Sequence, residues 1–378
     1  MTWIDSYKKE LAQLKEVLKS KNKILVQHRD VDGSCCAAQL LKFYPDFKTL
    51  SIKDPFIPDN IIMEIIEQKP ELLVFVDVGV DEHLDRIVKI KNQLKGAKIF
   101  LIDHHVIQND LNKNGILHIN PRFQDPEIYI PASLMVFHIL KHMESLEKTD
   151  RNTFLDKVHG KPVSSLSWIA CIGVISDYGH KNNKEFITEC KKQYGKLLDA
   201  KELIDSRIGD SAKTIYSAII LKGEYGVKKS VDCLVKSEGF GEFEKNETLK
   251  GWRLQVDKEI DDVVAKCEKD KEDINGVVFC EIDSKLNMAS IISNILTEKY
   301  QDKIVVVGKE VLDGWKVSIR GSRSHVSGKI NLANSVKIAV EGIGYGGGHP
   351  QAAGAFTQDW EKFKERLLKE INRNQNTI

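Results

Sequence analysis

Short apolar runs and amphipathic stretches alternate along roughly the first third of the chain. Amphipathic stretches, with apolar residues every three or four positions, predict helices over residues 3–20, 33–43, 59–68 and 81–94. Between them lie apolar runs of strand length, at residues 23–27, 47–53, 71–78, 97–103 and 116–120. Because strands that alternate with helices form parallel sheets covered by helices, this pattern predicts an α/β domain.

The pattern changes in the second half of the chain. Residues 181–272 are rich in Lys and Glu and have no strong strand signal, which predicts a helical insert and connector. Strand-like runs return at 276–280, 304–307 and 315–319. We therefore expect an α/β protein in three parts: a parallel-sheet domain over residues 1–180, the helical segment over 181–272, and a smaller C-terminal α/β domain over 273–378.

Metal-binding residue types stand where the apolar runs end. They are His28, Asp30 and Asp32 after the first run, Asp77 after the third, and Asp103, His104 and His105 after the fourth. A further acid, Asp177, ends the nearly apolar stretch 164–176, which predicts a buried helix. Since ligands bind at the carboxyl edge of parallel strands, we expect these side chains to meet there.

A structural explanation competes with a chemical one at each of these positions. A lone Asp such as Asp77 often caps a helix or bonds a loop. Several acids at one edge, however, repel one another unless cations neutralise them. Carboxylates together with imidazoles suit a pair of divalent metals, so the sequence predicts a two-metal hydrolase and phosphate-ester chemistry first.

Composition narrows the class of protein. The chain has 378 residues, enough for two domains with separate cores, and its 42% hydrophobic and 29% charged content is typical of globular proteins. The net charge of +1 means that the protein as a whole has no positive electrostatic potential that would attract nucleic acid. A local basic groove is compatible with this net charge. The seven cysteines show no CxxC spacing, and no apolar run reaches membrane length. We therefore expect a cytoplasmic protein that does not bind membranes.

These motifs, in this order, resemble those of the DHH phosphoesterases. The resemblance rests on His28-x-Asp30-x-Asp32, the isolated Asp77, Asp103-His104-His105 and the later Asp177. Near the other end, Gly346-Gly347-Gly348-His349 resembles the glycine-rich motif of the C-terminal domain found in RecJ-like nucleases and nanoRNases. The chain length and the helical segment look more like the archaeal RecJ-like nucleases, some of which associate with replication or repair factors.

The resemblance implies a role for each residue. One metal is implied to be held by His28, Asp30 and Asp77, and a second by Asp32, Asp77, His104 and Asp177. His105 is implied to face the scissile phosphate, and Asp103 to orient the neighbouring imidazole. Mixed imidazole and carboxylate ligands favour two Mn²⁺ ions, with Mg²⁺ or Co²⁺ as substitutes.

The C-terminal glycine cluster predicts a phosphate-binding face. Small residues follow Gly346, Gly347, Gly348 and His349, and Arg320 and Arg323 precede them. Exposed backbone amides beside guanidinium groups form an anion nest, which the resemblance assigns to substrate binding. A flexible turn is the alternative reading.

Three functions remain open at this stage. The first is an exonuclease acting on single-stranded DNA or RNA. The lysines of residues 181–272 would then bind the phosphates of the strand. The alternative is that these lysines only form a solvent-exposed helical face. The second is a phosphodiesterase for small substrates, such as short oligoribonucleotides, cyclic dinucleotides or a nucleoside bisphosphate. The third, a degenerate scaffold in a replication complex, is disfavoured because every metal position is filled. The sequence leaves the polarity, a replication or repair partner and a homo-oligomer undecided.

Overall fold

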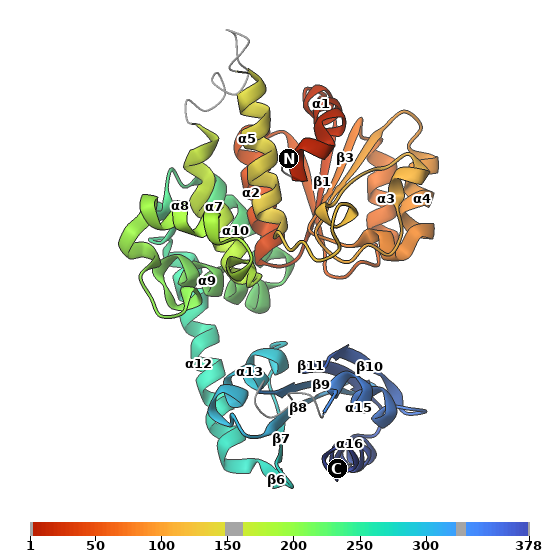
Figure 1. The fold of residues 1–378 in the computed structure, drawn as a ribbon, viewed down its shortest axis with the longest axis vertical. Coiled ribbons are helices and arrows are strands. Elements are labelled where there is room, and N and C mark those ends of the chain that lie inside the picture. The colour runs from red at the N-terminus through yellow and green to blue at the C-terminus, as the bar shows by residue number, and fades with distance from the viewer. Residues whose placement is uncertain (1–2, 148–161, 323–329, 377–378) are drawn as a thin grey trace. The chain divides into compact units, whose positions relative to one another are not determined.

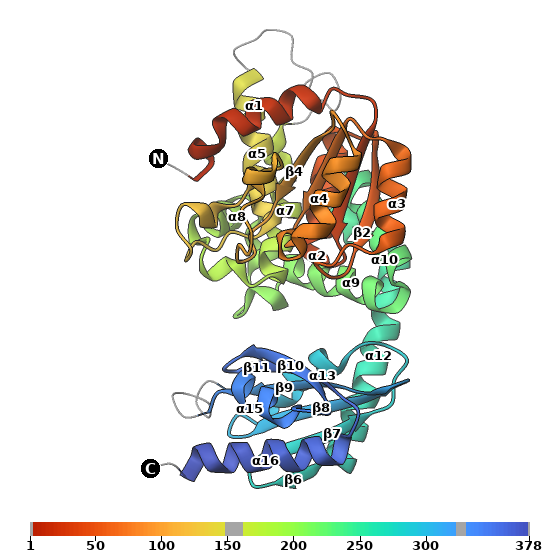
Figure 2. The ribbon, with the colours of Figure 1, turned by 90° about the vertical axis from the view of Figure 1, so that its right-hand side faces the viewer.

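The computed structural model of the chain describes residues 3–147, 162–322 and 330–376. It divides into two compact units, Met1–Arg253 and Leu254–Ile378. Figures 1 and 2 show the elements of each unit. The unit boundary falls inside the long helix α12 (Glu247–Asp270).

The first unit is built on a parallel sheet of five strands in the order β2-β1-β3-β4-β5. The strands are β1 (Lys23–His28), β2 (Phe47–Ile52), β3 (Leu72–Val76), β4 (Lys98–Ile102) and β5 (Leu117–Ile119). Backbone pairing continues one residue past the central strands, since Asp77 N donates to Ile102 O and Asp103 N to Ile119 O. The carboxyl ends of β1, β3 and β4 therefore lie level at one edge, and the predicted parallel α/β fold is confirmed.

Helices cover both faces of this sheet (Figure 1). Alternate strand residues face opposite ways: Leu25, Val74 and Phe100 belong to one core cluster, whereas Phe75 and Leu101 belong to the other. The first cluster packs against α1 (Lys8–Val17), α2 (Val31–Phe43), α5 (Ala132–Glu147) and α7 (Ser167–Ser176). The second packs against α3 (Asp59–Gln68) and α4 (Leu84–Gln93).

The Lys- and Glu-rich segment completes the first core cluster. Its helices are α8 (Lys184–Tyr194), α9 (Arg207–Lys222), α10 (Glu224–Lys236), α11 (Phe240–Phe243) and the start of α12. Their sparse apolar residues, such as Ile215, Leu234 and Phe240, are buried in the same cluster as the sheet residues. Trp168 of α7 contacts Phe240 and Phe243, with ring centroids 6.2 and 5.8 Å away. Up to Arg253, this segment is therefore part of the first unit.

The second unit has a mixed sheet of six strands in the order β10-β11-β9-β8-β7-β6. The strands are β6 (Glu272–Ile274), β7 (Val277–Ile282), β8 (Ile304–Val311), β9 (Gly314–Gly321), β10 (Gly344–His349) and β11 (Ala352–Thr357). One face packs against α15 (Leu332–Ala339) and α16 (Trp360–Asn376), which Figure 2 shows along the sheet, and the other against α13 (Ala289–Lys299) and α12.

The glycine-rich motif forms the edge strand β10, which the sequence pattern did not predict as a strand. The neighbouring chain explains the choice of residue. A Cβ at Gly344 would lie 2.0 Å from Phe356 O, and one at Gly346 would lie 2.6 Å from Val336 Cγ1. Glycine is disfavoured in strands, but here the close approach of strand and helix requires it.

A membrane-spanning helix needs both sufficient length and sufficient apolarity. Within the described ranges, no helix combines the two.

Replacing Trp168 with Ala tests whether residues up to 253 share one core with the sheet. The side chain is 2% exposed, so its loss should lower the free energy of unfolding by about 3–5 kcal/mol. Met63→Ala, at a side chain that is 52% exposed on α3, should change it by less than about 0.5 kcal/mol. Urea denaturation measures both, and equal small changes would contradict the shared core.

Candidate metal centre

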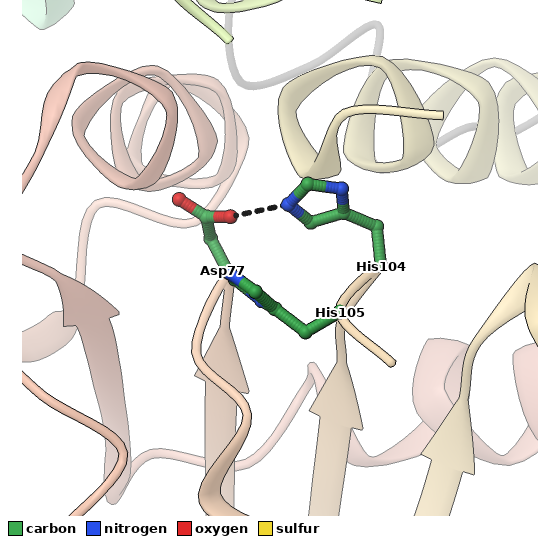
Figure 3. Close-up of side chains that lie close together, drawn as sticks. All are labelled: Asp77, His104 and His105. Atoms are coloured by element: carbon green, nitrogen blue, oxygen red, sulfur yellow. Dashed lines mark ion pairs between the residues drawn. The ribbon is translucent and has the colours of Figure 1, made fainter. Parts of the chain in front are cut away.

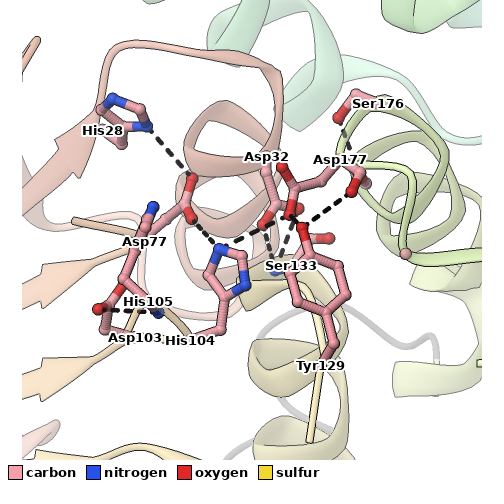
Figure 4. Close-up of polar contacts among 12 residues, drawn as sticks. His28, Asp32, Asp77, Asp103, His104, His105, Tyr129, Ser133, Ser176 and Asp177 are labelled. Atoms are coloured by element: carbon pink, nitrogen blue, oxygen red, sulfur yellow. Dashed lines mark hydrogen bonds and ion pairs between the residues drawn. The ribbon is translucent and has the colours of Figure 1, made fainter. Parts of the chain in front are cut away.

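Seven acidic and imidazole side chains converge at the carboxyl edge of the first sheet. Three sets of three have ligand atoms within 4.8 Å of one another. The sets are His28, Asp30 and Asp77; Asp32, His104 and Asp177; and Asp77, His104 and His105. We call these seven residues the acid–histidine cluster. Figure 4 shows most of them, and Figure 3 shows Asp77 with the two histidines that follow β4.

Asp77 lies between the two halves of the cluster. Its Oδ2 is 3.7 Å from His28 Nδ1, and its Oδ1 is 3.3 Å from His104 Nε2. Its φ is 61°, a left-handed conformation that is uncommon for residues other than glycine. The side chain is 2% exposed, and among the described residues Oδ2 has no hydrogen-bond partner. A buried carboxylate oxygen in this position is costly unless a cation meets it.

The backbone around His28 prepares it as a ligand. Its Nε2 lies 3.0 Å from Lys53 O, so a proton on Nε2 can be donated to that carbonyl. Nδ1 then presents its lone pair toward the cluster, where Asp30 Oδ2 is 2.8 Å away. The other Asp30 oxygen accepts a hydrogen bond from Gly33 N and caps α2. Asp30 thus serves both the helix and the cluster.

Asp32 occupies a buried niche between three helices. Both carboxylate oxygens lie 3.3 Å from Ser133 N at the start of α5. A Cβ at Gly173 of α7 would lie 2.4 Å from Asp32 Oδ1 and 2.3 Å from Ser133 Oγ. Only glycine at position 173 therefore allows α7 to pack this close to Asp32 and Ser133. Sequence reasoning missed both Ser133 and Gly173, although an isolated glycine in an apolar helix signals a close approach.

Tyr129 holds the last acid of the cluster. Its hydroxyl lies 2.5 Å from Asp177 Oδ2 and 2.9 Å from Asp177 O, and can donate to either (Figure 4). The same Asp177 Oδ2 lies 3.6 Å from His104 Nε2. Tyr129 stands in an irregular segment, and nothing in the sequence pattern indicated its role.

Asp103 orients His105. One carboxylate oxygen lies 2.8 Å from His105 Nδ1, and the other accepts a hydrogen bond from His105 N. The His105 side chain is 46% exposed, whereas that of Asp103 is 1% exposed. With Nδ1 engaged by a buried carboxylate, Nε2 is left for a substrate to reach.

The crowded charges perturb one another. Burial raises the pKa of Asp32 well above its usual range, and burial together with Asp77 raises the pKa of Asp30 to about 6. Burial alone would lower the pKa of each imidazole, but neighbouring carboxylates raise the pKa of His28 to about 11 and that of His104 to about 9. Without a metal, protonated imidazoles thus balance the acids. A divalent cation bound at the same atoms would take over this role.

Two further histidines of the first unit, His118 and His138, lie outside the ligand triplets. His118 is fully buried, with its ring against Phe123. His138 contacts the rings of Trp3 and Phe137, and burial lowers its pKa to about 4. Both side chains contribute to packing.

The expected substrate residues of the second unit lie along two strands. Arg320, in β9, donates from Nη2 to Ser290 Oγ and from Nε to Asn294 Oδ1, both at 2.9 Å. His349 ends β10 and is exposed. Gly346, Gly347 and Gly348 lie along the same strand, whereas Arg323 falls outside the described residues.

Three solved structures share the fold of this chain. A DHH-domain protein described as a member of a family of ribosomal proteins is 18% identical, with a TM-score of 0.73 over 98% of this chain and 92% of that one. A manganese-bound RecJ exonuclease is 16% identical, with a TM-score of 0.67 over 98% and 94%. RecJ of Thermus thermophilus in complex with Mn²⁺ is 17% identical, with a TM-score of 0.66 over 97% and 54%.

Family models match both units. The model of the DHH family N-terminal domain matches residues 23–159, which hold His28, Asp77 and His104, and the DHHA1 domain model matches residues 273–376. No curated protein sequence matches the chain. The motifs of the first unit, the two family models and the shared fold agree. The chain belongs to the DHH superfamily of phosphoesterases and carries a C-terminal DHHA1 domain.

Proposed function

We propose that this phosphoesterase is a RecJ-like exonuclease that cuts single-stranded DNA or RNA from an end with the help of two divalent metals. The observation that carries the proposal is the set of ligand triplets that overlap at Asp77 and His104. A single structural cation would need only one triplet. Overlapping triplets instead suit two ions that share a carboxylate, the arrangement used for in-line displacement at phosphorus.

The donor set fits the proposed metals. His28, Asp30 and Asp77 would hold one ion, and Asp32, Asp77, His104 and Asp177 the other. Mixed imidazole and carboxylate donors suit Mn²⁺, with Mg²⁺ or Co²⁺ as substitutes, and the RecJ structures with this fold are described with manganese. When bound, such a pair supplies a nucleophile at neutral pH and stabilises the charge that develops on the phosphate.

His105 is proposed to contact the scissile phosphate. Burial alone would lower its pKa, but the Asp103 carboxylate raises it to about 9 in the metal-free protein. Its side chain is 46% exposed, and Asp103 engages Nδ1 of the ring. A charge-assisted hydrogen bond from Nε2 to a phosphate oxygen is the contact that this geometry favours.

Nucleic acid is proposed as the substrate because of the cations on the helical segment. Exposed lysines there are Lys191, Lys192, Lys196, Lys222 and Lys228, and such side chains bind a phosphate backbone without reading its sequence. In the second unit, Arg320 is held in place by Ser290 and Asn294. Together with the exposed His349, it is proposed to bind the substrate.

Removing the shared carboxylate tests the metal pair. Asp77→Ala should lower Mn²⁺-dependent hydrolysis by well over a hundredfold, beyond the roughly ten- to hundredfold typical of residues that only orient a ligand. Metal content by elemental analysis should fall in parallel. Chelation with EDTA should inactivate the wild type, and Mn²⁺ should restore it better than Ca²⁺, which prefers more oxygen ligands.

The matched control for that variant is Asp205→Ala, because Asp205 pairs with Lys213 on the surface. It should keep both activity and metal. Near-normal turnover by Asp77→Ala in saturating Mn²⁺ would rule out the shared carboxylate.

The raised pKa values of the imidazoles predict how stability depends on pH. His28 has a pKa of about 11 in the folded protein against an ordinary 6.5, so its proton stabilises the metal-free fold fully below pH 6.5. This stabilisation is lost as pH rises toward 11, and His104, with a pKa of about 9, behaves alike. The melting temperature of EDTA-treated protein should therefore fall between pH 6.5 and 9.

Bound metal should remove this dependence because it replaces the protons. Mn²⁺ affinity, measured by titration calorimetry under nitrogen, should rise with pH over the same range. The variant His28→Gln should show a shallower decline in melting temperature. A metal-free melting temperature that rises with pH would refute the charge balance described here.

Replacing His349 separates substrate binding from metal binding. His349→Ala should keep the metal content of the wild type, while hydrolysis of single-stranded nucleic acid falls roughly ten- to a hundredfold through loss of a charge-assisted contact. A small aryl phosphodiester should be affected much less. Leu312→Ala, at a side chain that is 99% exposed in the same unit, serves as the control. Equal losses on both substrates would remove His349 from the binding face.

A further inference from the structure

Tyr178 is a large exposed aromatic residue that directly follows Asp177, the last acid of the acid–histidine cluster. Its side chain is 59% exposed. Consecutive Cα atoms are about 3.8 Å apart, so the tyrosine starts within one residue of a proposed metal ligand. The ring of Tyr178 has no role in the metal binding proposed above.

The backbone of Tyr178 is strained. Its φ and ψ are 54° and 16°, in the left-handed region that bulky residues rarely adopt. Among the described residues other than glycine, three more have a positive φ. Lys69 is the C-cap of α3, and Tyr178 itself directly follows the C-cap of α7, so both lie at helix ends. Asn275 precedes Gly276 in a tight turn, and all three are common places for this conformation. The remaining residue, Asp77, belongs to the cluster, and strain of this kind gathers at functional sites.

The surrounding chain holds the strained turn in place. A Cβ at Gly179 would lie 2.2 Å from Pro131 Cγ, so the turn packs tightly against the start of α5. Asn183 Nδ2 donates to Gly179 O at 2.8 Å and to Tyr129 O at 3.0 Å. Tyr129 is also the residue whose hydroxyl bonds the cluster acid. The backbone that carries Tyr178 and the carboxylate of Asp177 are therefore tied to the same segment.

The residues that follow Tyr178 suit a single-stranded nucleic acid. The ring of His180 lies 6.4 Å from that of Tyr178, at an interplanar angle of 43°. Lys181 and Lys184 come next and are exposed. An aromatic face for a base, followed by cations for the phosphates, is the combination found in proteins that bind single strands.

We propose that Tyr178 stacks against a nucleobase next to the scissile phosphate, so that the site selects base-bearing strands over simple phosphodiesters. This inference rests on the proposed nuclease function and adds a substrate requirement to it. Stacking uses the π-face that every base has, so no preference among the bases is expected. The backbone conformation at residue 178 favours glycine, yet the chain has a tyrosine there. We attribute this choice to a role of the aromatic ring in binding.

The test compares ring-deleting and ring-keeping variants on matched oligonucleotides. The variants are Tyr178→Ala, Tyr178→Gly and Tyr178→Phe, with Tyr225→Ala, at a side chain 61% exposed on α10, as the control. The substrates are short oligothymidylates, intact or with an abasic residue at the 5′ or the 3′ end. Steady-state kinetics are measured in Mn²⁺. Binding of the same strands, labelled with fluorescein, is measured by anisotropy in Ca²⁺.

Loss of the ring should weaken binding of the intact strand and raise KM by roughly five- to a hundredfold. Tyr178→Phe and Tyr225→Ala should stay close to wild type. For the strand that lacks the stacked base, Tyr178→Ala should make little difference. Tyr178→Gly should melt at or above the wild-type temperature, because φ of 54° favours glycine.

Two results would overturn the inference: equal losses on intact and abasic strands, or no loss from Tyr178→Ala on any strand. Tyr178-dependent binding by a wild type that hydrolyses no strand would reject the proposed nuclease activity but keep the stacking site. A wild type that neither binds nor hydrolyses single strands would reject both.

Discussion

Electrostatic repulsion among crowded carboxylates is the constraint on which the rest of the first unit depends. Asp30, Asp32, Asp77 and Asp177 meet at one sheet edge, and Asp32 and Asp77 are buried there, where little solvent screens them. The fold must supply positive charge there. In the metal-free protein the imidazoles do so by holding protons far above their ordinary pKa. Other costs at this edge, such as the left-handed backbone of Asp77 and the glycine required in α7, follow from bringing these groups together.

The parallel sheet makes this gathering possible. The strand ends lie level, so His28, Asp77 and the residues after β4 lie side by side. Asp177 comes from a helix instead, as the residue that ends α7. Asp103 and Tyr129 then orient individual members without joining a ligand triplet. Asn183, which bonds Tyr129 O and Gly179 O, ties the segment after Asp177 to the segment that holds Asp177.

Much of this could be predicted from the sequence, because apolar runs that end in Asp or His identify both the strands and the edge where their ligands meet. The parallel α/β fold and the family are confirmed. Tyr129 could not be found, since its contact with Asp177 arises from tertiary packing of an irregular segment. The strand β10 was also missed. Glycine in a sequence ordinarily indicates a turn. Gly344 and Gly346 lie in a strand because Phe356 and Val336 approach their backbone too closely for a side chain.

The most direct test of the account is a crystal structure of the protein soaked in Mn²⁺, with anomalous diffraction recorded near the manganese edge. The account predicts two anomalous peaks about 3.5–4 Å apart, with Asp77 contacting both. One peak should be bound by His28 and Asp30, and the other by Asp32, His104 and Asp177. A single peak, or two peaks without Asp77 between them, would contradict the shared-carboxylate metal pair.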